Sequence, residues 1–274
     1  GQIQYPSIGF WHIKNISGEV GLLGHYRFQS SLLDDLKEEQ NTTNFSGKLK
    51  INSNSYMWDQ GIIRLDLNGE YNPEFRDDKY LVVPDRSEVR TLSKLDMRTT
   101  IFGDKKINLT SFYNINNSYF NRENLTNVRS DNKQWGGLFS FNNRILPVTL
   151  NFRKSSWEQT ETETGRSFIM DQKSLEGRAT KSFYNNDKHE LKYTYREYRY
   201  NYADLNTVRN NISRTDLNNQ LYFDKKRDYS FNSNISYYSQ TGTSDFTRIE
   251  TNERVVLHLP LNLDINSNYN YYQM

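Results

Sequence analysis

The chain has 274 residues, of which 35% are hydrophobic and 14% aromatic, and its 35 basic and 33 acidic side chains leave a net charge of +2. The lack of cysteine excludes disulfides, thiolate metal sites and cysteine nucleophiles. The aromatic content argues against disorder, and the interspersed charges form no basic stripe for nucleic acid. No apolar run approaches the roughly 18 residues of a membrane helix.

The first predicted elements lie before residue 58. Residues 1–17 are ambiguous, because apolar and polar residues alternate there but Pro6 interrupts the pattern, so this part is either an arm or a first strand. Alternation then predicts strands over residues 18–30 and 45–57, with a polar loop, LLDDLKEEQNTTN, between them.

The same alternation of apolar and polar residues continues to the end of the chain. It predicts further strands over residues 63–71, 95–101, 107–113, 135–141, 148–153, 175–183, 191–196, 217–223, 229–237, 255–257 and 261–271. The count is therefore about 13 strands, or 14 with the N-terminal arm.

The predicted connections are of two kinds. Short turns rich in Asn, Asp, Gly, Lys or Pro fall near residues 60, 104, 144, 186, 226 and 260. Long polar loops are predicted over residues 32–44, 72–90, 117–133, 158–166, 204–214 and 239–248. The turns recur at roughly 40 residues, as propeller blades do, but each interval holds two long strands and not four. We therefore expect an antiparallel up-and-down meander.

The alternation gives the meander a charged face and an apolar face, and in a membrane barrel the first would line the lumen. The predicted lumen-facing residues are Lys48, Lys50, Arg64, Asp66, Asp96, Arg98, Asn151, Arg153, Glu176, Arg178, Lys192 and Arg196. The predicted lipid-facing residues are Leu49, Ile51, Ile63, Leu65, Leu67, Val148, Leu150, Phe152, Leu261, Leu263 and Ile265.

Short turns at one edge and long loops at the other, expected in the periplasm and outside the cell, and strands long enough to cross a bilayer at a tilt favour a membrane barrel over a soluble sandwich, which would alternate in the same way. Two further features do so. Aromatic residues gather near strand ends, as in interfacial girdles, with Trp135 and Trp157 marking one interface. Charged residues occupy mid-strand positions, which a water-filled lumen tolerates. Arg64 and Asp66 are expected to face Asp96 and Arg98 as a charge ladder, which serves structure or selectivity.

On these residues and this periodicity the chain resembles bacterial outer-membrane β-barrel proteins, porin-like in the broad sense. The resemblance covers nearly the whole chain as a single barrel domain or barrel segment and implies the bacterial outer membrane as its location. It implies a pore, or part of a transport or export channel, with the lipid bilayer as partner. Tyr- and Asn-rich strands such as NLDINSNYNYY are also similar to barrels that sheathe multihaem cytochromes.

Three functional hypotheses therefore stay open. The first is the pore or channel, and the second is a scaffold barrel that encloses a partner protein or docks as a subunit of a larger complex. The third is a soluble or fibrous surface β-protein.

The strand directions predict that the chain is part of a larger barrel. With turns in the periplasm, the first full strand and the last strand both run outward, whereas single-chain barrels usually have an even number of strands and both termini in the periplasm. We therefore expect further strands or other subunits to complete the barrel.

Chemical motifs are sparse. The four histidines, His12, His25, His189 and His258, lack the spacing of metal ligands. Carboxylate pairs such as Asp34-Asp35 fall in predicted loops, where a solvated charge run or a weak calcium site is open. No nucleophile elbow, phosphate loop or dinucleotide motif occurs. We therefore expect no enzymatic activity, no cofactor and no metal.

Overall fold

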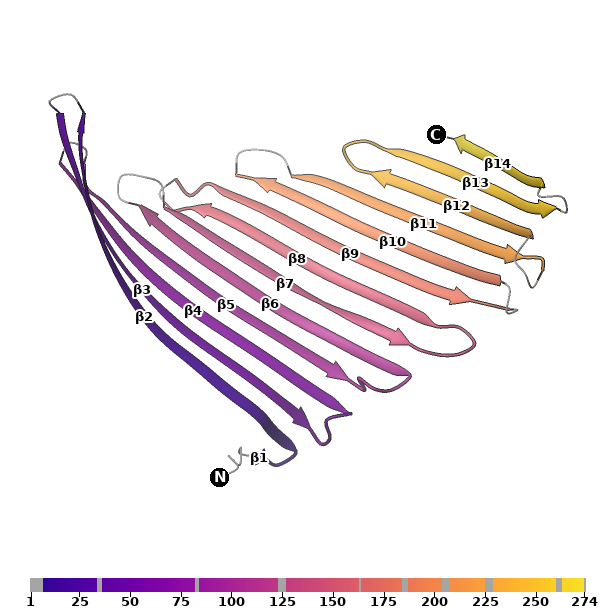
Figure 1. Cartoon of the computed structure of the whole chain (residues 1–274), viewed down its shortest axis with the longest axis horizontal. Helices are drawn as coiled ribbons and strands as arrows, with labels where there is room; N and C mark the ends of the chain where they lie inside the picture. The colour runs from indigo at the N-terminus through magenta and orange to yellow at the C-terminus, as the bar shows by residue number, and fades with distance from the viewer. Residues whose placement is uncertain are drawn as a thin grey trace.

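The computed structural model describes residues 7–33, 36–81, 84–122, 127–162, 164–183, 187–203, 207–224, 229–259 and 263–273. These residues form one antiparallel sheet of 14 strands, in which each strand pairs with its neighbours in sequence (Figure 1). The all-β, up-and-down prediction is therefore confirmed. No helix in the described part of the chain is long and apolar enough to cross a membrane.

The strands are longest at the N-terminal side of the sheet. Their bounds are β1 Ser7–Ile8, β2 Trp11–Leu33, β3 Leu36–Met57, β4 Ile63–Tyr80, β5 Arg86–Ile101, β6 Ile107–Arg122, β7 Val128–Phe141, β8 Val148–Glu161, β9 Ser167–Lys181, β10 Asp187–Tyr202, β11 Val208–Tyr222, β12 Tyr229–Thr241, β13 Phe246–Leu259 and β14 Leu263–Gln273.

The ambiguous N-terminal segment is divided between two elements. Residues 1–6 lie outside the described residues, Ser7–Ile8 forms the two-residue strand β1, Gly9 and Phe10 form a turn, and the segment from Trp11 onward belongs to β2. A register shift between Ile13 and Asn15 lets β2 continue through this region against β3. The first long strand therefore begins at Trp11, earlier than the predicted position of residue 18.

The predicted long loops are wrong. Between residues 72 and 90, for example, β4 runs to Tyr80 and β5 begins at Arg86, so the strands continue through most of the polar segment. The other five predicted loops are shortened in the same way by β2–β3, β6–β7, β8–β9, β10–β11 and β12–β13. Connections at the two edges of the sheet are consequently of similar length, and loop length does not distinguish these edges.

The short turns near residues 60, 104 and 144 are confirmed, because they lie between β3 and β4, β5 and β6, and β7 and β8. The three later turns involve residues 184–186, 225–228 and 260–262, which lie outside the described residues. We call the edge with these six connections the turn edge, and the opposite edge the loop edge.

The sheet is a single layer and remains open. None of the described hydrophobic residues is buried. The strand order is linear from β1 to β14, and no described strand joins β2 to β14. Both of these strands run from the turn edge to the loop edge (Figure 1). A barrel is therefore not formed by the described residues alone.

Candidate functional site: a polar face with a groove

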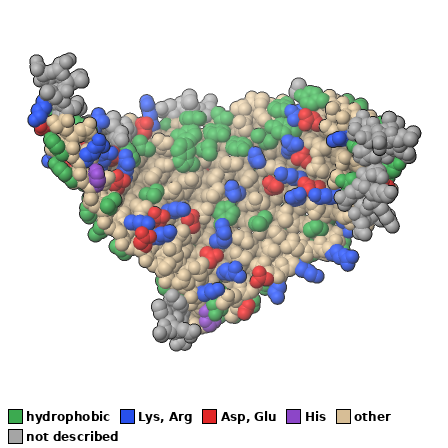
Figure 2. Space-filling view, in the orientation of Figure 1, with side chains coloured by type: hydrophobic (Ala, Val, Ile, Leu, Met, Phe, Trp, Pro, Cys, Tyr) green, Lys and Arg blue, Asp and Glu red, His purple; other side chains and the backbone are tan. Residues whose placement is uncertain are grey.

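The strand register places all twelve predicted lumen residues on one face of the sheet, which we call the polar face. Lys50 pairs with Glu70, Asp66 with Arg98, and Asn151 with Glu176, so these side chains alternate with the apolar ones along each strand. Figure 2 shows this face, where acidic and basic side chains are interspersed over much of its middle and hydrophobic ones gather near the loop edge.

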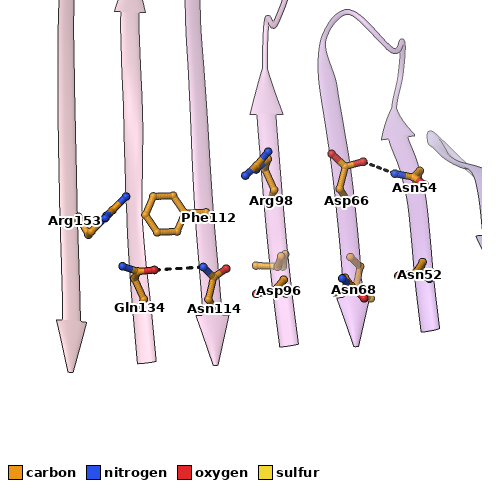
Figure 3. Close-up of a pocket in the computed structure, with 12 residues that line it drawn as sticks. Asn52, Asn54, Asp66, Asn68, Asp96, Arg98, Phe112, Asn114, Gln134 and Arg153 are labelled. Atoms are coloured by element: carbon orange, nitrogen blue, oxygen red, sulfur yellow. Dashed lines mark hydrogen bonds between the residues drawn. The ribbon is translucent and has the colours of Figure 1, made fainter. Parts of the chain in front are cut away.

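A groove crosses β3 to β8 on the polar face, with a volume of about 650 Å³. Two neighbouring rows of side chains line it, each row following the register from strand to strand (Figure 3). The charged row is Asn54, Asp66, Arg98, Phe112, Gly136 and Arg153. The amide row is Asn52, Asn68, Asp96, Asn114 and Gln134. We refer to this site as the polar groove.

Phe112 has its place in the groove because a glycine lies beside it. Gly136 is opposite Phe112 on one side and Arg153 on the other. A Cβ atom at Gly136 would lie 2.8 Å from the Phe112 ring and 2.2 Å from the carbonyl oxygen of Phe152. The Arg153 guanidinium lies 5.7 Å from the ring centroid, within cation–π range. The bare backbone at Gly136 thus leaves room for the ring.

Hydrogen bonds hold part of each row. Asn54 Nδ2 donates to Asp66 Oδ1 at 2.6 Å, and Asn114 Nδ2 donates to Gln134 Oε1 at 3.5 Å (Figure 3). Lys94 Nζ lies 3.1 Å from Asp96 Oδ2 and forms its ion pair along the same strand. These contacts orient the carboxylates and amides without filling the groove.

The predicted charge ladder between β4 and β5 forms only in part. Asp66 is opposite Arg98, but Arg64 is opposite Thr100 and Asp96 is opposite Asn68. Among the described residues, no ion pair joins the two strands at these positions; Asp66 is bound by Asn54, and Asp96 by Lys94.

Charge pairs across strands occur elsewhere on the polar face. Arg178 lies 2.6 Å from Glu190, Lys192 lies 3.3 Å from Glu176, and Lys48 lies 2.9 Å from Glu19. Four of the predicted residues, Lys48, Glu176, Arg178 and Lys192, therefore form ion pairs. Glu190, the partner of Arg178, and Glu19, the partner of Lys48, were not among the predicted site residues.

The opposite side of the sheet, which we call the apolar face, carries the predicted lipid-facing residues that the structure describes. Leu49, Ile51 and Ile265 are more than two fifths exposed, and Leu150 is 44% exposed. Ile63, Leu65, Leu67, Val148 and Phe152 share this face by register and are half-buried by their neighbours. Leu261 lies outside the described residues, and for Leu263 only the backbone, in β14, is described.

The two tryptophans of the β7–β8 hairpin were predicted to mark one interface, but they lie on opposite faces of the sheet. Trp135 is opposite Lys154 on the apolar face, whereas Trp157 shares the polar face with Arg153 and donates a hydrogen bond to Ser130 Oγ at 2.9 Å. Trp157 also contacts Phe168, which contacts Tyr202. Trp157 lies four residues after Arg153, and an even spacing within a strand indicates the same face. The prediction of an aromatic girdle did not take this spacing into account.

No known protein family, curated protein or solved structure detectably matches this chain. Within the described residues, no group of three or more histidine, cysteine or acidic side chains is arranged to hold a metal ion. We therefore infer function from the two faces of the sheet and the polar groove.

Proposed function

We propose that the chain forms the wall of an outer-membrane β-barrel that acts as a pore or as part of a transport channel. The observation that carries this proposal is the apolar face, which no part of the described chain covers. A soluble protein buries such a face in a core, and exposed apolar patches beyond a few hundred Å² mark interaction or membrane surfaces. A bilayer would cover the face while the polar face stays in contact with water.

The limits of the apolar face support a membrane environment. On β7, β8 and β9 the apolar run that starts at the turn edge ends at Trp135, Phe152 and Leu175, and the next residues on the same face are Lys133, Lys154 and Lys173; on β9 one apolar residue, Ile169, follows beyond the lysine. A change from aromatic or aliphatic side chains to lysines within one step is typical of the water interface of a membrane strand.

The apolar face reaches the turn edge on the other side. From Trp135 to Phe141 it spans six residue steps, or about 20 Å along the strand. Exposed apolar residues in the adjoining turns, including Phe102, Ile145 and Leu146, extend it further. The apolar face therefore approaches the height of the apolar band of a membrane barrel only when these turn residues are included, which places the turns at the membrane interface.

The unpaired backbone groups of the first and last strands of the sheet indicate that additional strands are needed. In lipid, unpaired N–H and C=O groups each cost several kcal/mol, about 4–8 kcal/mol in the least polar reference solvents, so an open edge does not persist there. Since β2 and β14 run in the same direction, direct closure would require a parallel contact in an otherwise antiparallel sheet. We infer that further strands lie between them.

Single-channel recording tests the channel proposal. Purified protein, together with whatever strands copurify with it, is added to a planar bilayer, and we expect stepwise currents that depend on the protein. A barrel that inserts into the bilayer but carries no current would contradict the pore and favour a scaffold barrel. A monodisperse preparation without detergent would contradict membrane insertion altogether.

A further inference from the structure

We propose that the polar groove binds a neutral, hydroxyl-rich ligand of the carbohydrate class, with Phe112 as the stacking platform and the amide row as the hydrogen-bonding partner. The inference rests on the proposed function for the groove's position on a channel wall. The binding chemistry itself comes from the groove's own residues, and binding can be measured independently of transport.

The amide row supplies the type of hydrogen bonding that hydroxyl groups need. A sugar hydroxyl both donates and accepts a hydrogen bond, and a primary amide offers two donor hydrogens and an acceptor oxygen. Asn52, Asn68 and Asn114 repeat this group on neighbouring or nearly neighbouring strands, about 4.8 Å apart per strand. Such a ladder presents amide donors along an extended ligand, with acceptor oxygens at Asn52 and Asn114, because the Oδ1 atom of Asn68 is buried.

The charge balance of the groove favours a neutral ligand. Among the residues that line it, two aspartates, Asp66 and Asp96, are matched by two arginines, Arg98 and Arg153; Lys94, which pairs with Asp96, does not line the groove. An anionic ligand would meet both carboxylates, and a cationic ligand would meet both guanidinium groups. Charged side chains next to a neutral polyol still form strong hydrogen bonds with its hydroxyl groups.

Phe112 adds the apolar component that a sugar ring requires. Pyranose rings have a face of C–H groups, and the face of an aromatic ring is electron-rich and attracts them. Phe112 is half-buried and extends from β6 into the groove beside Arg98 and Arg153 (Figure 3). The space above Gly136 gives the ring its position, so the platform is built into the sheet.

A second hollow on the polar face provides an internal comparison. It crosses β10 to β13, has a volume of about 570 Å³ and is also rich in amides, including Asn218, Asn234 and Asn252. No aromatic residue of the described chain lines it. We therefore expect the ligand to bind more tightly in the polar groove, where hydrogen bonding and stacking combine.

Isothermal titration of the detergent-purified protein tests this proposal, with four neutral hexasaccharides as probes: malto-, cello-, xylo- and N-acetylchitohexaose. We expect saturable binding of at least one, and no comparable binding of hexagalacturonate, its anionic counterpart. Failure of all four to bind, or tighter binding of the anion, would overturn the inference. Neither result depends on conductance, so a protein that conducts ions but binds no sugar would refute this inference and leave the channel proposal intact.

Matched variants locate the binding site. Phe112→Ala should weaken binding of the bound hexasaccharide about tenfold or more, because the stacking surface is lost, whereas Phe112→Tyr should restore most of the affinity. Phe168→Ala, which removes an aromatic side chain elsewhere on the polar face, and Asn252→Ala, in the second hollow, serve as controls. Equal losses for Phe112→Ala and Phe168→Ala would place the site outside the groove and overturn the assignment.

Discussion

Neighbouring residues on β8 illustrate what each face of the sheet is expected to contact. Leu150 lies on the apolar face at 44% exposure, and Asn151 lies next to it on the polar face. In a bilayer, Leu150→Arg would bring a charge to lipid near the middle of the apolar band and should cost about 2–4 kcal/mol of folding free energy. Asn151→Arg, exposed to water, should cost little.

Reversible unfolding in urea with phospholipid vesicles measures both variants against the parent protein. A similar free-energy loss at the two positions would contradict the assignment of lipid to one face and water to the other.

Gly136 supports a second prediction at the residue scale. Because a Cβ atom there would lie 2.2 Å from the Phe152 carbonyl oxygen and 2.8 Å from the Phe112 ring, Gly136→Ala must displace backbone or ring. We expect a loss of about 1–3 kcal/mol, the usual range for overpacking. Gly24→Ala is the matched control, because a Cβ atom at Gly24 would meet no atom within 4 Å. Urea unfolding that shows equal stability for both variants would rule out the close packing at Gly136.

At the scale of strands, the sequence predicted position and face well but strand length poorly. Near the loop edge the polar face also carries hydrophobic side chains and the apolar face carries charged ones, so the alternation of hydrophobicity that marks a strand disappears there. Pro73 added to the impression of a loop, yet it lies within β4. The β3–β4 ladder has no pairs between Ser46↔Glu74 and Leu49↔Tyr71, and Gly47 leaves space for the proline ring.

Polar contacts hold these extended strand ends together in place of apolar pairs. Thr42 Oγ1 donates to Asp78 Oδ1 at 2.6 Å, and Asn44 Nδ2 donates to Glu74 Oε1 at 3.0 Å. Neither pair could be read from the sequence, because each joins residues more than two dozen positions apart. The groove could not be predicted either. Of the residues that line it, only Asp66, Asp96, Arg98 and Arg153 were among the predicted lumen-facing residues, and the rows that they join depend on the register between strands.

The two edges of the sheet lead to a topology prediction. Since the chain has no cysteine, single cysteines can be introduced without background. Thr164→Cys lies in an exposed connection at the loop edge, and Asp104→Cys lies in an exposed connection at the turn edge. In intact cells that make the protein, we expect a membrane-impermeant maleimide to label the first and not the second. This follows the sequence-based expectation that the turns lie in the periplasm, and labelling of Asp104→Cys alone would show that the turn edge lies outside the cell.

At the scale of the whole molecule, the sequence already predicted that the sheet does not close into a barrel by itself. Predicted strand directions implied that the first long strand and the last run the same way, and β2 and β14 do so. What could not be predicted is which strands complete the sheet, because hydrogen bonding at a strand edge depends on backbone groups that every residue type carries.

Native mass spectrometry in detergent tests the completion of the barrel. We expect particles heavier than the 32.6 kDa of this chain, because the proposed barrel needs further strands to pair with β2 and β14. A particle of 32.6 kDa in which cysteines placed on β2 and β14 form a disulfide would show that the chain closes on itself and would contradict the requirement for further strands.

The central claim is that one face of this sheet contacts lipid and the other contacts water, and a fluorescence scan of β8 tests it most directly. Single cysteines at each position from Val148 to Arg153 are labelled with an environment-sensitive dye in protein folded into vesicles. Labels at 148, 150 and 152 should be quenched by spin-labelled lipids, and labels at 149, 151 and 153 by aqueous iodide, with a period of two. Iodide quenching of equal strength at all six positions would contradict the claim.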